Sequence, residues 1–438
     1  MNIKSRYDVA IIGAGLGGMV AGALLARDGY SVVVLEKLPV PGGRYTSEGY
    51  KGFKIATGAW ALGLHGPQGP VYKTLMDLGC KLDIRIPGPY DRVTRIHGVD
   101  VPMPESGGLR TVISRVAKSK AEEEHVMTTT RKALTGEQAV SGELTAKEWV
   151  SSMTDNALIH GMFDFFIRAM SAINYEDIPA NRYVNYLRTF GRLKGVTTTV
   201  RDGNGGATRA LIELIRQQGG DVITLAEANE VVIQDGRATA VVFKDRRGIT
   251  RDIQADCVIS NVGPKATLKL AGVHNLSIDY QRAVNELVPT VATTVIWSYD
   301  EPLGDYNGFY SFIDTPRLTT VWEPYHLWPT YTAGGKCCAY AFMTMKSNDV
   351  ETELAEGMAE VHANFPVLSK ADVVKSLMMR DNWPILRASG VGLPVKTPVD
   401  GLYSVGDGNM PDGWLCGEGV IMGVHEAVND IKAHFKPQ

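Results

Sequence analysis

The sequence has few cysteines and almost no excess of charge of either sign. Its five cysteines, an odd number, show no CxxC spacing, so we expect a reducing, cytoplasmic environment and no disulfide framework. Lysine and arginine total 45 against 48 aspartates and glutamates, a formal net charge of −3. This balance excludes a general electrostatic attraction to nucleic acid or anionic lipid, and no nucleic-acid partner is predicted.

Metal-binding and membrane-spanning signals are missing as well. The nine histidines show no HxH or HExxH spacing, so no metal site is predicted. No apolar run approaches the roughly 18 residues that cross a bilayer, and Lys4, Arg6 and Asp8 leave no room for an apolar secretion signal before the first motif. We expect a soluble protein with at most peripheral membrane contact. The sequence neither predicts nor excludes a homo-oligomer.

Glycine, in contrast, is abundant, with 47 residues in a chain of 438. At roughly 100 to 200 residues per domain, this length predicts two to four domains. The glycines cluster at residues 13–18, 42–43 and 417–423, and these clusters carry most of the functional information.

The first cluster lies inside a predicted strand–helix–strand unit. Residues 7–12 (YDVAII) and 31–35 (SVVVL) are short apolar runs on either side of a helical segment, which predicts two parallel strands. Gly13, Gly15 and Gly18 occupy the GxGxxG positions. There, the first glycine permits a tight turn, the second lets the backbone approach a pyrophosphate, and the third lets the helix pack closely on the sheet.

An acidic residue stands where a ribose-binding acid is expected. Glu36 ends the second predicted strand and is followed by Lys37. A carboxylate there accepts hydrogen bonds from both ribose hydroxyls of an adenosine and repels a 2′-phosphate, which disfavours NADP. Because the phosphates would meet the N-terminus of the helix, with its unpaired N–H groups, this segment predicts dinucleotide binding.

Residues 41–44 (PGGR) follow directly. With this E-x(5)-GGR pattern after a GxGxxG unit, the chain resembles the amine oxidase and phytoene desaturase superfamily of FAD enzymes, in its phytoene dehydrogenase-like branch. The resemblance implies FAD as the cofactor, with the loop of Gly43 and Arg44 along the diphosphate. It also implies that a valine of the strand predicted at 230–233, Val231 or Val232, meets the adenine through its backbone.

The C-terminal segment extends the resemblance. Residues 401–407 (GLYSVGD) predict a strand and a Gly-Asp turn, and residues 417–427 (GEGVIMGVHEA) predict a glycine-rich helix. The resemblance implies that Asp407 hydrogen-bonds the ribityl chain and that the backbone at Gly419 and Val420 faces the flavin pyrimidine. The helix dipole would then stabilise the anionic end of the reduced ring.

The predicted fold class is α/β, with a discontinuous, Rossmann-like FAD-binding domain and a second, α+β substrate domain built on a mixed sheet. We expect residues 1–75, 200–275 and 383–438 to form the FAD-binding domain. Residues 76–199 and 276–382 should form the substrate domain. The resemblance implies little about these residues, because function depends on a pocket built on a shared fold.

Residues 321–331 (VWEPYHLWPTY) are the main candidates for substrate contact. Trp322, Tyr325 and His326 would wall a pocket over the flavin, with His326 as a candidate general base. An equally weighted alternative is that these aromatic side chains pack in the core of a sheet. Trp60 and His65 are further pocket candidates.

Residues 156–172 form a broad apolar helical face. In membrane-associated relatives such helices guard an access channel, but the missing lysine and arginine enrichment favours a core helix here.

These patterns predict a FAD-dependent oxidoreductase that takes a hydride from carbon to flavin N5, with dehydrogenation of an apolar, alicyclic or isoprenoid-like substrate as the leading reaction. The electrons would pass to oxygen, a quinone or another carrier. One alternative is an amine oxidase that produces an imine and hydrogen peroxide. The other is a redox-neutral flavin isomerase or a non-catalytic FAD-binding protein.

Overall fold

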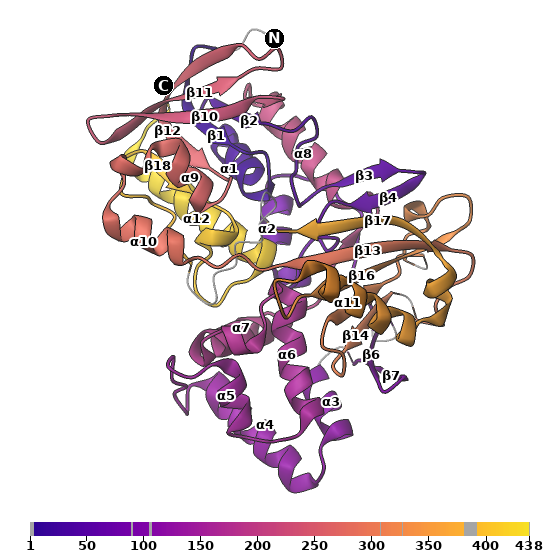
Figure 1. Ribbon diagram of the computed structural model, residues 1–438. Coiled ribbons are helices and arrows are strands. Elements are labelled where there is room, and N and C mark those ends of the chain that lie inside the picture. The colour runs from indigo at the N-terminus through magenta and orange to yellow at the C-terminus, as the bar shows by residue number, and fades with distance from the viewer. Residues whose placement is uncertain are drawn as a thin grey trace.

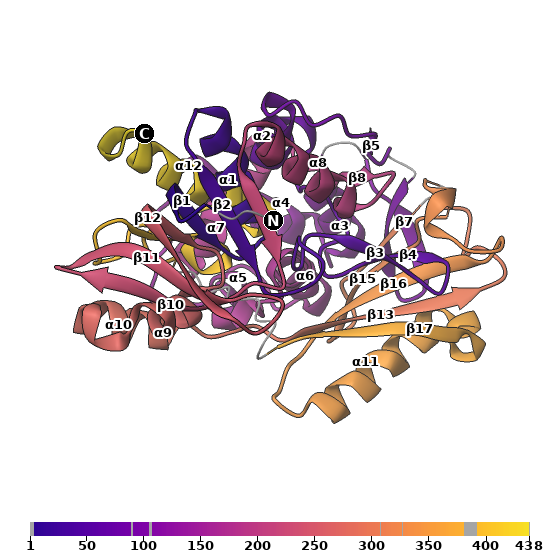
Figure 2. The same ribbon diagram turned by 90° about the horizontal axis from the view of Figure 1, so that it is seen from above.

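The computed structural model describes residues 4–88, 91–104, 107–306, 308–325, 327–380 and 392–437. Figure 1 shows one sheet in the upper part of the molecule, a second sheet at the right and a group of helices below. Seen from above, the two sheets lie side by side (Figure 2). Both ends of the chain lie beside the first sheet.

The strand–helix–strand unit at the N-terminus forms as predicted. It consists of β1 (Arg6–Ile12), α1 (Leu16–Arg27) and β2 (Val32–Glu36). β1 and β2 are parallel, with Val9 opposite Val32. All five residues of β2 are buried, because a parallel strand is covered on both faces, and this explains its unbroken apolar run.

The first sheet has seven strands in the order β10-β11-β12-β1-β2-β9, with β18 paired to β12. Its core is parallel, and β10, β11 and β12 form an antiparallel meander. It therefore gathers strands from both ends and the middle of the sequence. Its other strands are β9 (Asp221–Thr224), β10 (Glu227–Gln234), β11 (Arg237–Lys244), β12 (Thr250–Ser260) and β18 (Leu402–Ser404).

Helices cover both faces of this sheet, as in a Rossmann-like domain. One face packs against α1, α2 (Pro70–Asp77), α8 (Asn204–Gln217) and α12 (Cys416–His434). The other packs against α9 (Pro264–Ala271) and α10 (Ile278–Glu286). α8 begins at Asn204, because Gly203 adopts φ 62° as its N-cap and the glycines after Asn204 form the first turn.

The second sheet also has seven strands, in the order β17-β13-β16-β15-β14-β6-β7. β14 and β6 pair in parallel and the other neighbours are antiparallel, so the predicted mixed sheet is confirmed. Its strands are β6 (Arg92–Ile96), β7 (Val99–Pro102), β13 (Ala292–Tyr299), β14 (Phe309–Phe312), β15 (Leu318–Trp322), β16 (Cys337–Thr344) and β17 (Asp372–Met379).

The two faces of the second sheet have different neighbours. α11 (Val350–Asn364) and the following turn cover one face, where Val361 and Phe365 pack against Trp297 and Tyr310. Side chains alternate along each strand, so Arg92, Phe309 and Trp322, paired across β6, β14 and β15, share the opposite face. That face is turned toward the middle of the molecule.

The lower helices in Figure 1 form a separate hydrophobic cluster. They are α3 (Gly108–Val116), α4 (Lys120–Thr135), α5 (Ala146–Ser151), α6 (Ala157–Ser171) and α7 (Ala180–Arg192). Two small sheets complete the fold, β3 (Ser47–Tyr50) with β4 (Phe53–Ala56) and β5 (Ile84–Arg85) with β8 (Thr199–Val200). Among the described helices, none is both long and apolar enough to cross a membrane.

Candidate functional site

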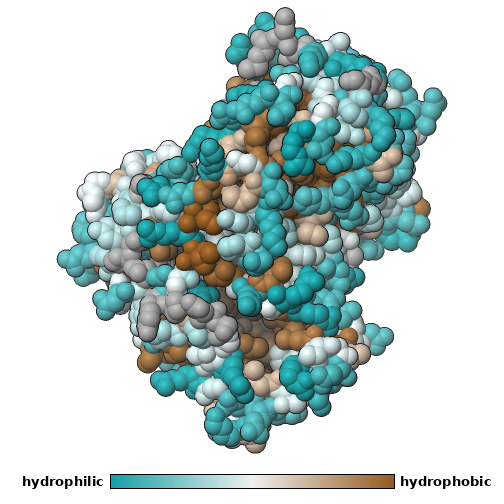
Figure 3. Space-filling view, turned by 180° about the vertical axis from the view of Figure 1, so that it is seen from behind, coloured by the Kyte–Doolittle hydropathy of each residue, from teal (hydrophilic) through white to brown (hydrophobic). Residues whose placement is uncertain are grey.

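A continuous cavity of about 1010 Å³ lies where the first sheet, the second sheet and helices α6 and α7 meet. Small-molecule sites commonly enclose roughly 300–1,000 Å³, so this cavity has room for a large ligand or for two. Seen from behind, apolar side chains are exposed around a hollow at mid-height of the molecule (Figure 3). One part of the cavity is built on the glycine loop and the other on the helices and the second sheet.

The glycine loop between β1 and α1 forms the floor of the first part. Gly13, Gly15 and Gly17 line it, and Gly13 has φ 94°, a conformation that favours glycine. A Cβ atom on Gly18 would lie 2.1 Å from the carbonyl oxygen of Gly13. The structure therefore requires glycine at position 18 for the close approach of α1 to the loop, while Gly18 itself does not line the cavity among the described residues.

Asn261, just beyond the end of β12, holds this loop from the neighbouring strand. In the amide orientation that satisfies its hydrogen bonds, its side-chain oxygen accepts from the N–H groups of Gly15 at 3.3 Å and Gly18 at 3.2 Å. A Cβ atom on Gly17 would lie 2.6 Å from the same amide. Asn261 thus caps α1 and lines the cavity. The sequence does carry a signal for Asn261, because it is the polar residue at the end of an apolar strand, at the carboxyl edge of the sheet.

Glu36 is buried, with an exposure of 6%, yet its side chain lines the cavity. One carboxylate oxygen accepts from the Ala14 N–H and the other from the Leu38 N–H, both at 2.8 Å. A carboxylate has about four acceptor positions, so the group keeps capacity for a ligand after fixing the two loops. The exposed Lys37 lines the same region.

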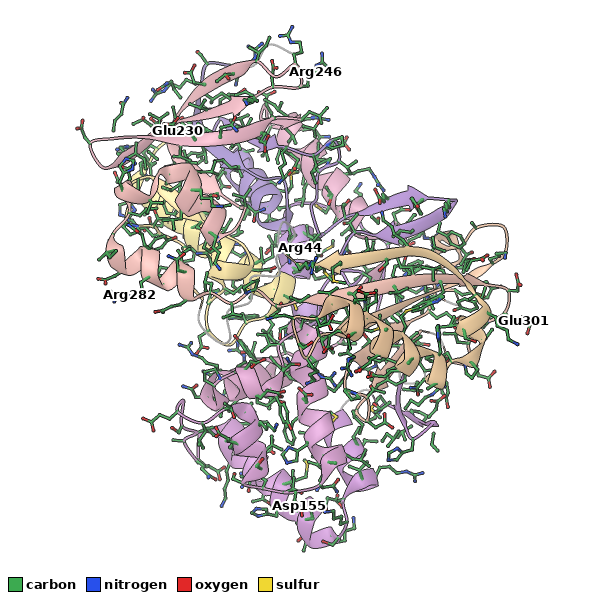
Figure 4. The ribbon with its side chains drawn as sticks, in the orientation of Figure 1. Arg44, Asp155, Glu230, Arg246, Arg282 and Glu301 are labelled. Carbon is green, nitrogen blue, oxygen red and sulfur yellow. The ribbon has the colours of Figure 1, made fainter. Side chains whose placement is uncertain are left out.

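Arg44 and Asp407 meet across the cavity. Nη2 of Arg44 lies 2.6 Å from Oδ2 of Asp407, and both residues line the cavity together with Gly42 and Gly43. Figure 4 shows Arg44 where the two sheets approach each other, whereas Glu230, Arg246, Arg282 and Glu301 point outward at the periphery. This ion pair joins the loop of the second glycine cluster to the Gly-Asp turn that follows β18.

The N-terminus of α12 forms the next part of the wall. Cys416, Gly417 and Val420 line the cavity; Gly419 is buried, and a Cβ atom on it would meet Met410 Sδ at 2.6 Å. The helix begins at Cys416, one residue before the predicted segment. Its four leading N–H groups lack intrahelical partners, which makes this end suited to an electron-rich ligand.

Glu418 was not identified from the sequence. Its carboxylate is 1% exposed and accepts from the N–H groups of Leu64, His65 and Val71 at 3.0, 3.3 and 2.8 Å. It fixes the segment containing Gly63 and Leu64, both of which line the cavity, to α12. A lone glutamate in a helix carries no sequence signal for this role, because its partners lie about 350 positions earlier.

Tyr45 lines the cavity close to Glu418 and donates its hydroxyl hydrogen to the Leu62 carbonyl. Burial, reinforced by the Glu418 carboxylate, raises the pKa of Tyr45 well above its ordinary value of 10.0. The phenol therefore stays protonated at neutral pH and serves as a fixed donor to the backbone.

From β10 and the residue before it, the cavity is lined by Ala226, Glu227 and Ala228. Val231 and Val232, the valines implied by the resemblance, lie further along this strand, paired with Val241 and Ala240 of β11. Neither is among the described residues that line the cavity. The part of β10 that lines the cavity is its start, because that end adjoins β2 and Glu36, where the Ala226 N–H donates to the Glu36 carbonyl at 2.9 Å.

The second part of the cavity, which we call the chamber, has a helical wall that is almost entirely apolar. α6 contributes both to the core, through Ile159 and Ile167, and to this wall, so the segment predicted as a core helix also borders the cavity. The wall residues from α6 and α7 are Met162, Phe163, Phe165, Phe166, Ala169, Met170, Tyr183, Leu187, Phe190 and Gly191.

The opposite wall of the chamber is the inner face of the second sheet. Phe309 and Phe342 give it apolar surface, while Arg92, Thr94, Ser311 and Thr320 give it polar groups. Arg92 was not identified from the sequence, since an arginine that begins a strand carries no functional signal by itself.

Of the three predicted catalytic residues, His326 lies outside the described residues. Trp322 has an exposure of 0% and stacks against Trp60, with ring centroids 5.0 Å apart. Trp60 lines the cavity, whereas Trp322 and Tyr325 are not among the described lining residues. Trp322 therefore supports the wall from behind.

His65 is buried and packs against Phe190, beside Glu418. It is not among the described residues that line the cavity.

Comparison with known proteins agrees with this architecture. Residues 11–78 match the NAD(P)-binding Rossmann-like domain family. An uncharacterised protein of Methanocaldococcus jannaschii is 26% identical over 97% of this chain and 99% of its own length. A prolycopene isomerase of Daucus carota is 39% identical over 93 residues, which cover 20% of this chain and 14% of that protein.

Two solved structures match nearly the whole chain. An oxidoreductase from Methanosarcina mazei has a TM-score of 0.86 at 26% identity, covering 96% of this chain and 99% of that one. A putrescine oxidase has a TM-score of 0.73 at 15% identity, covering 98% and 99%. The chain thus has a Rossmann-like domain within the fold shared by these oxidoreductases. The predicted resemblance to the amine oxidase and phytoene desaturase superfamily is confirmed.

Proposed function

We propose that the protein is a FAD-dependent oxidoreductase that removes a hydride from a carbon atom of an apolar substrate. One observation carries the proposal. A single cavity runs from the glycine loop and Glu36, past the Arg44–Asp407 pair, to the N-terminus of α12 and into an apolar chamber. A dinucleotide held by the first part would present its far end to a substrate in the second.

The residues of the first part fit FAD. The N-terminus of α1 would hold the diphosphate, and Glu36, with its remaining acceptor capacity, would hold the ribose. Glycine at positions 13, 15 and 17 keeps the surface that these residues line free of side chains. The predicted residues that line the cavity and would hold the cofactor are Gly13, Gly15, Glu36, Lys37, Gly43, Arg44, Asp407 and Val420, with Ala226–Ala228 in place of Val232. Gly18 and Gly419 would act indirectly, because their lack of a side chain lets α1 and α12 pack closely behind this surface.

FAD, when bound, supplies a hydride acceptor at N5 of its ring. The chain's own residues then do three things. The apolar side chains of α6 and α7 exclude water and position the substrate. The N-terminus of α12 places N–H dipoles beside the site, and Glu418 holds the loop of Gly63 and Leu64 against that helix.

The reaction that we propose for this chamber is dehydrogenation, in which a saturated carbon–carbon bond gives a hydride to FAD and a proton to solvent and becomes an alkene. The electrons would then leave to oxygen, a quinone or another carrier. An amine oxidase is the competing proposal because a putrescine oxidase shares the fold. A redox-neutral isomerase is the other, because of the local match to a prolycopene isomerase.

The test is an anaerobic titration of the FAD-reconstituted protein, followed by flavin absorbance. A panel of saturated cyclic and isoprenoid compounds should bleach the flavin, and a panel of primary amines should leave it oxidised. Bleaching of the flavin by amines alone would contradict the proposed dehydrogenase and support an amine oxidase. Conversion of one alkene isomer to another without any bleaching of the flavin would contradict the proposed dehydrogenase and support an isomerase.

A further inference from the structure

The chamber carries a charge pattern that distinguishes between substrate classes. The carboxylates among the described lining residues are Glu36, Glu227 and Asp407, and all three belong to the first part of the cavity. The chamber itself has two cations in its described lining, Arg92 and Lys194. A cationic substrate would therefore meet like charges and no described carboxylate in the chamber.

Arg92 is the cation that the fold positions firmly. It begins β6 and lies directly opposite Phe309 of β14, which also lines the cavity. Its Nη2 donates to the Pro104 carbonyl at 3.1 Å, which fixes the guanidinium, and the side chain is half-buried. A guanidinium carries five N–H donors in a planar fork, a geometry that suits a carboxylate or a phosphate. Lys194, by contrast, is exposed in the turn after α7.

A row of hydroxyl groups lies beside Arg92 on the same face of the sheet. Thr94 stands two residues after Arg92 on β6, Ser311 pairs with Thr94, and Thr320 pairs with Ser311. All three line the cavity. Side chains two residues apart on a strand share a face, so these hydroxyls continue the polar surface that Arg92 begins. The wall opposite, from α6 and α7, offers apolar side chains.

We propose that the chamber takes an amphipathic molecule, with an apolar body and an anionic end group, carboxylate or phosphate, bound by Arg92. The body lies against α6 and α7, and the hydroxyl row of Thr94, Ser311 and Thr320 hydrogen-bonds the polar end. This inference rests on the proposed function for the identity of the site and adds the class of substrate. It argues against an amine oxidase, because a cationic amine would meet the positive charges of Arg92 and Lys194 in the chamber.

The experiment measures binding by calorimetry to the FAD-reconstituted full-length protein. Four probes share one apolar body and differ only in the end group: farnesoic acid, farnesyl monophosphate, farnesol and farnesylamine. A charged hydrogen-bonded pair contributes about 1.5–3 kcal/mol, and 1.4 kcal/mol is tenfold in affinity. We therefore expect the acid or the phosphate, or both, to bind at least about tenfold more tightly than the alcohol, and the amine to bind most weakly. The better of the two anions identifies the end group.

Variants assign the effect to Arg92. Arg92→Met should abolish the preference for the anion and leave the affinity for farnesol within about twofold, while Arg92→Lys should retain part of the preference. Arg110→Gln is the matched control: it removes the same charge from an exposed position of α3 outside the described lining. It should keep the full preference. Flavin content and thermal unfolding establish that each variant is folded.

The outcomes separate this inference from the proposed function. Equal affinity for acid, phosphate and alcohol in a protein that binds FAD would overturn the anionic substrate and leave the oxidoreductase intact. Loss of the preference in Lys194→Gln but not in Arg92→Met would overturn the role of Arg92. Failure to bind FAD would contradict the proposed function, while the same probes titrated into the FAD-free protein would still test Arg92.

Discussion

Arg44 and Asp407 form an ion pair of 2.6 Å between Nη2 and Oδ2, although they belong to motifs at opposite ends of the sequence. Arg44 follows the paired glycines after β2, and Asp407 follows the turn after β18. Their side chains are 31% and 11% exposed, and both line the cavity. The pair therefore connects the two motifs at the place where a dinucleotide would cross between them.

Breaking this pair should weaken cofactor binding more than it weakens the fold. Because Arg44 is about a third exposed, the pair itself should contribute no more than about 1 kcal/mol to stability. Arg44→Gln should lower FAD affinity by about tenfold, since it removes a charged contact to the diphosphate. A double-mutant cycle with Asp407→Asn, followed by fluorescence titration with FAD, measures the coupling. Additive effects of the two substitutions on FAD affinity would show that the pair has no role in binding.

Glu36→Gln should reduce FAD affinity by about 10- to 100-fold, because a charged hydrogen-bond acceptor is worth about 1.5–3 kcal/mol. The substitution keeps the size of the side chain but places an amide N–H against the N–H of Ala14 or Leu38. Glu230→Gln, exposed on β10 (Figure 4), is the control. An affinity equal to that of the control variant would reject the ribose role of Glu36.

Gly18→Ala should destabilise the protein, because the added Cβ would lie 2.1 Å from Gly13 O and 3.2 Å from Ile11 Cγ2. Overpacking of this kind costs about 1–3 kcal/mol. Urea denaturation measures the change in the free energy of unfolding. Gly49→Ala, where a Cβ meets nothing within 4 Å, should shift it by less than about 0.5 kcal/mol. Equal stability of the two variants would mean that α1 does not pack as closely as described.

The stability of the protein should fall below neutral pH partly through His425 on α12. Burial lowers the pKa of His425 below its ordinary value of 6.5, an effect that Asp77 partly offsets, and Thr74 Oγ1 lies 2.7 Å from its Nε2. The unfolded chain thus takes up a proton at a pH where the folded chain does not. The contribution of His425 to the free energy of unfolding is fully present above pH 6.5 and is lost as the pH falls through the lowered pKa of the folded state.

His425→Gln should therefore lose less stability than the unmodified protein between pH 7.5 and 5.5, as measured by urea denaturation at both values. The comparison between the two proteins cancels the titration of the other histidines. A parallel loss in both would exclude His425 as a source of the pH dependence.

The features that sequence predicts well here are those encoded locally. The turn at Gly13, the helix after it and the strand ending at Glu36 are written within about 30 consecutive residues, and β18 and α12 follow the same logic near the C-terminus. The mixed second sheet was also predicted.

The features that sequence missed depend on contacts between distant segments. Glu418 acts on N–H groups about 350 positions away, and Arg92 faces the cavity only because β6 pairs with β14. Val231 or Val232 was predicted to meet the adenine, whereas the part of this segment that lines the cavity is Ala226–Ala228, because the position of β10 relative to β2 is a tertiary property. Trp322 was predicted either to wall the pocket or to pack in a sheet core, and the packing of Trp60 over it places it behind the wall.

The most direct test of the central claim is a calorimetric titration of the cofactor-free protein with FAD, with NADH and NADPH as competitors. We expect one FAD bound per chain with micromolar or tighter affinity, a shifted flavin absorbance spectrum, and no displacement by either nicotinamide cofactor. Absence of FAD binding, or displacement of FAD by NADH at comparable concentration, would contradict the central claim.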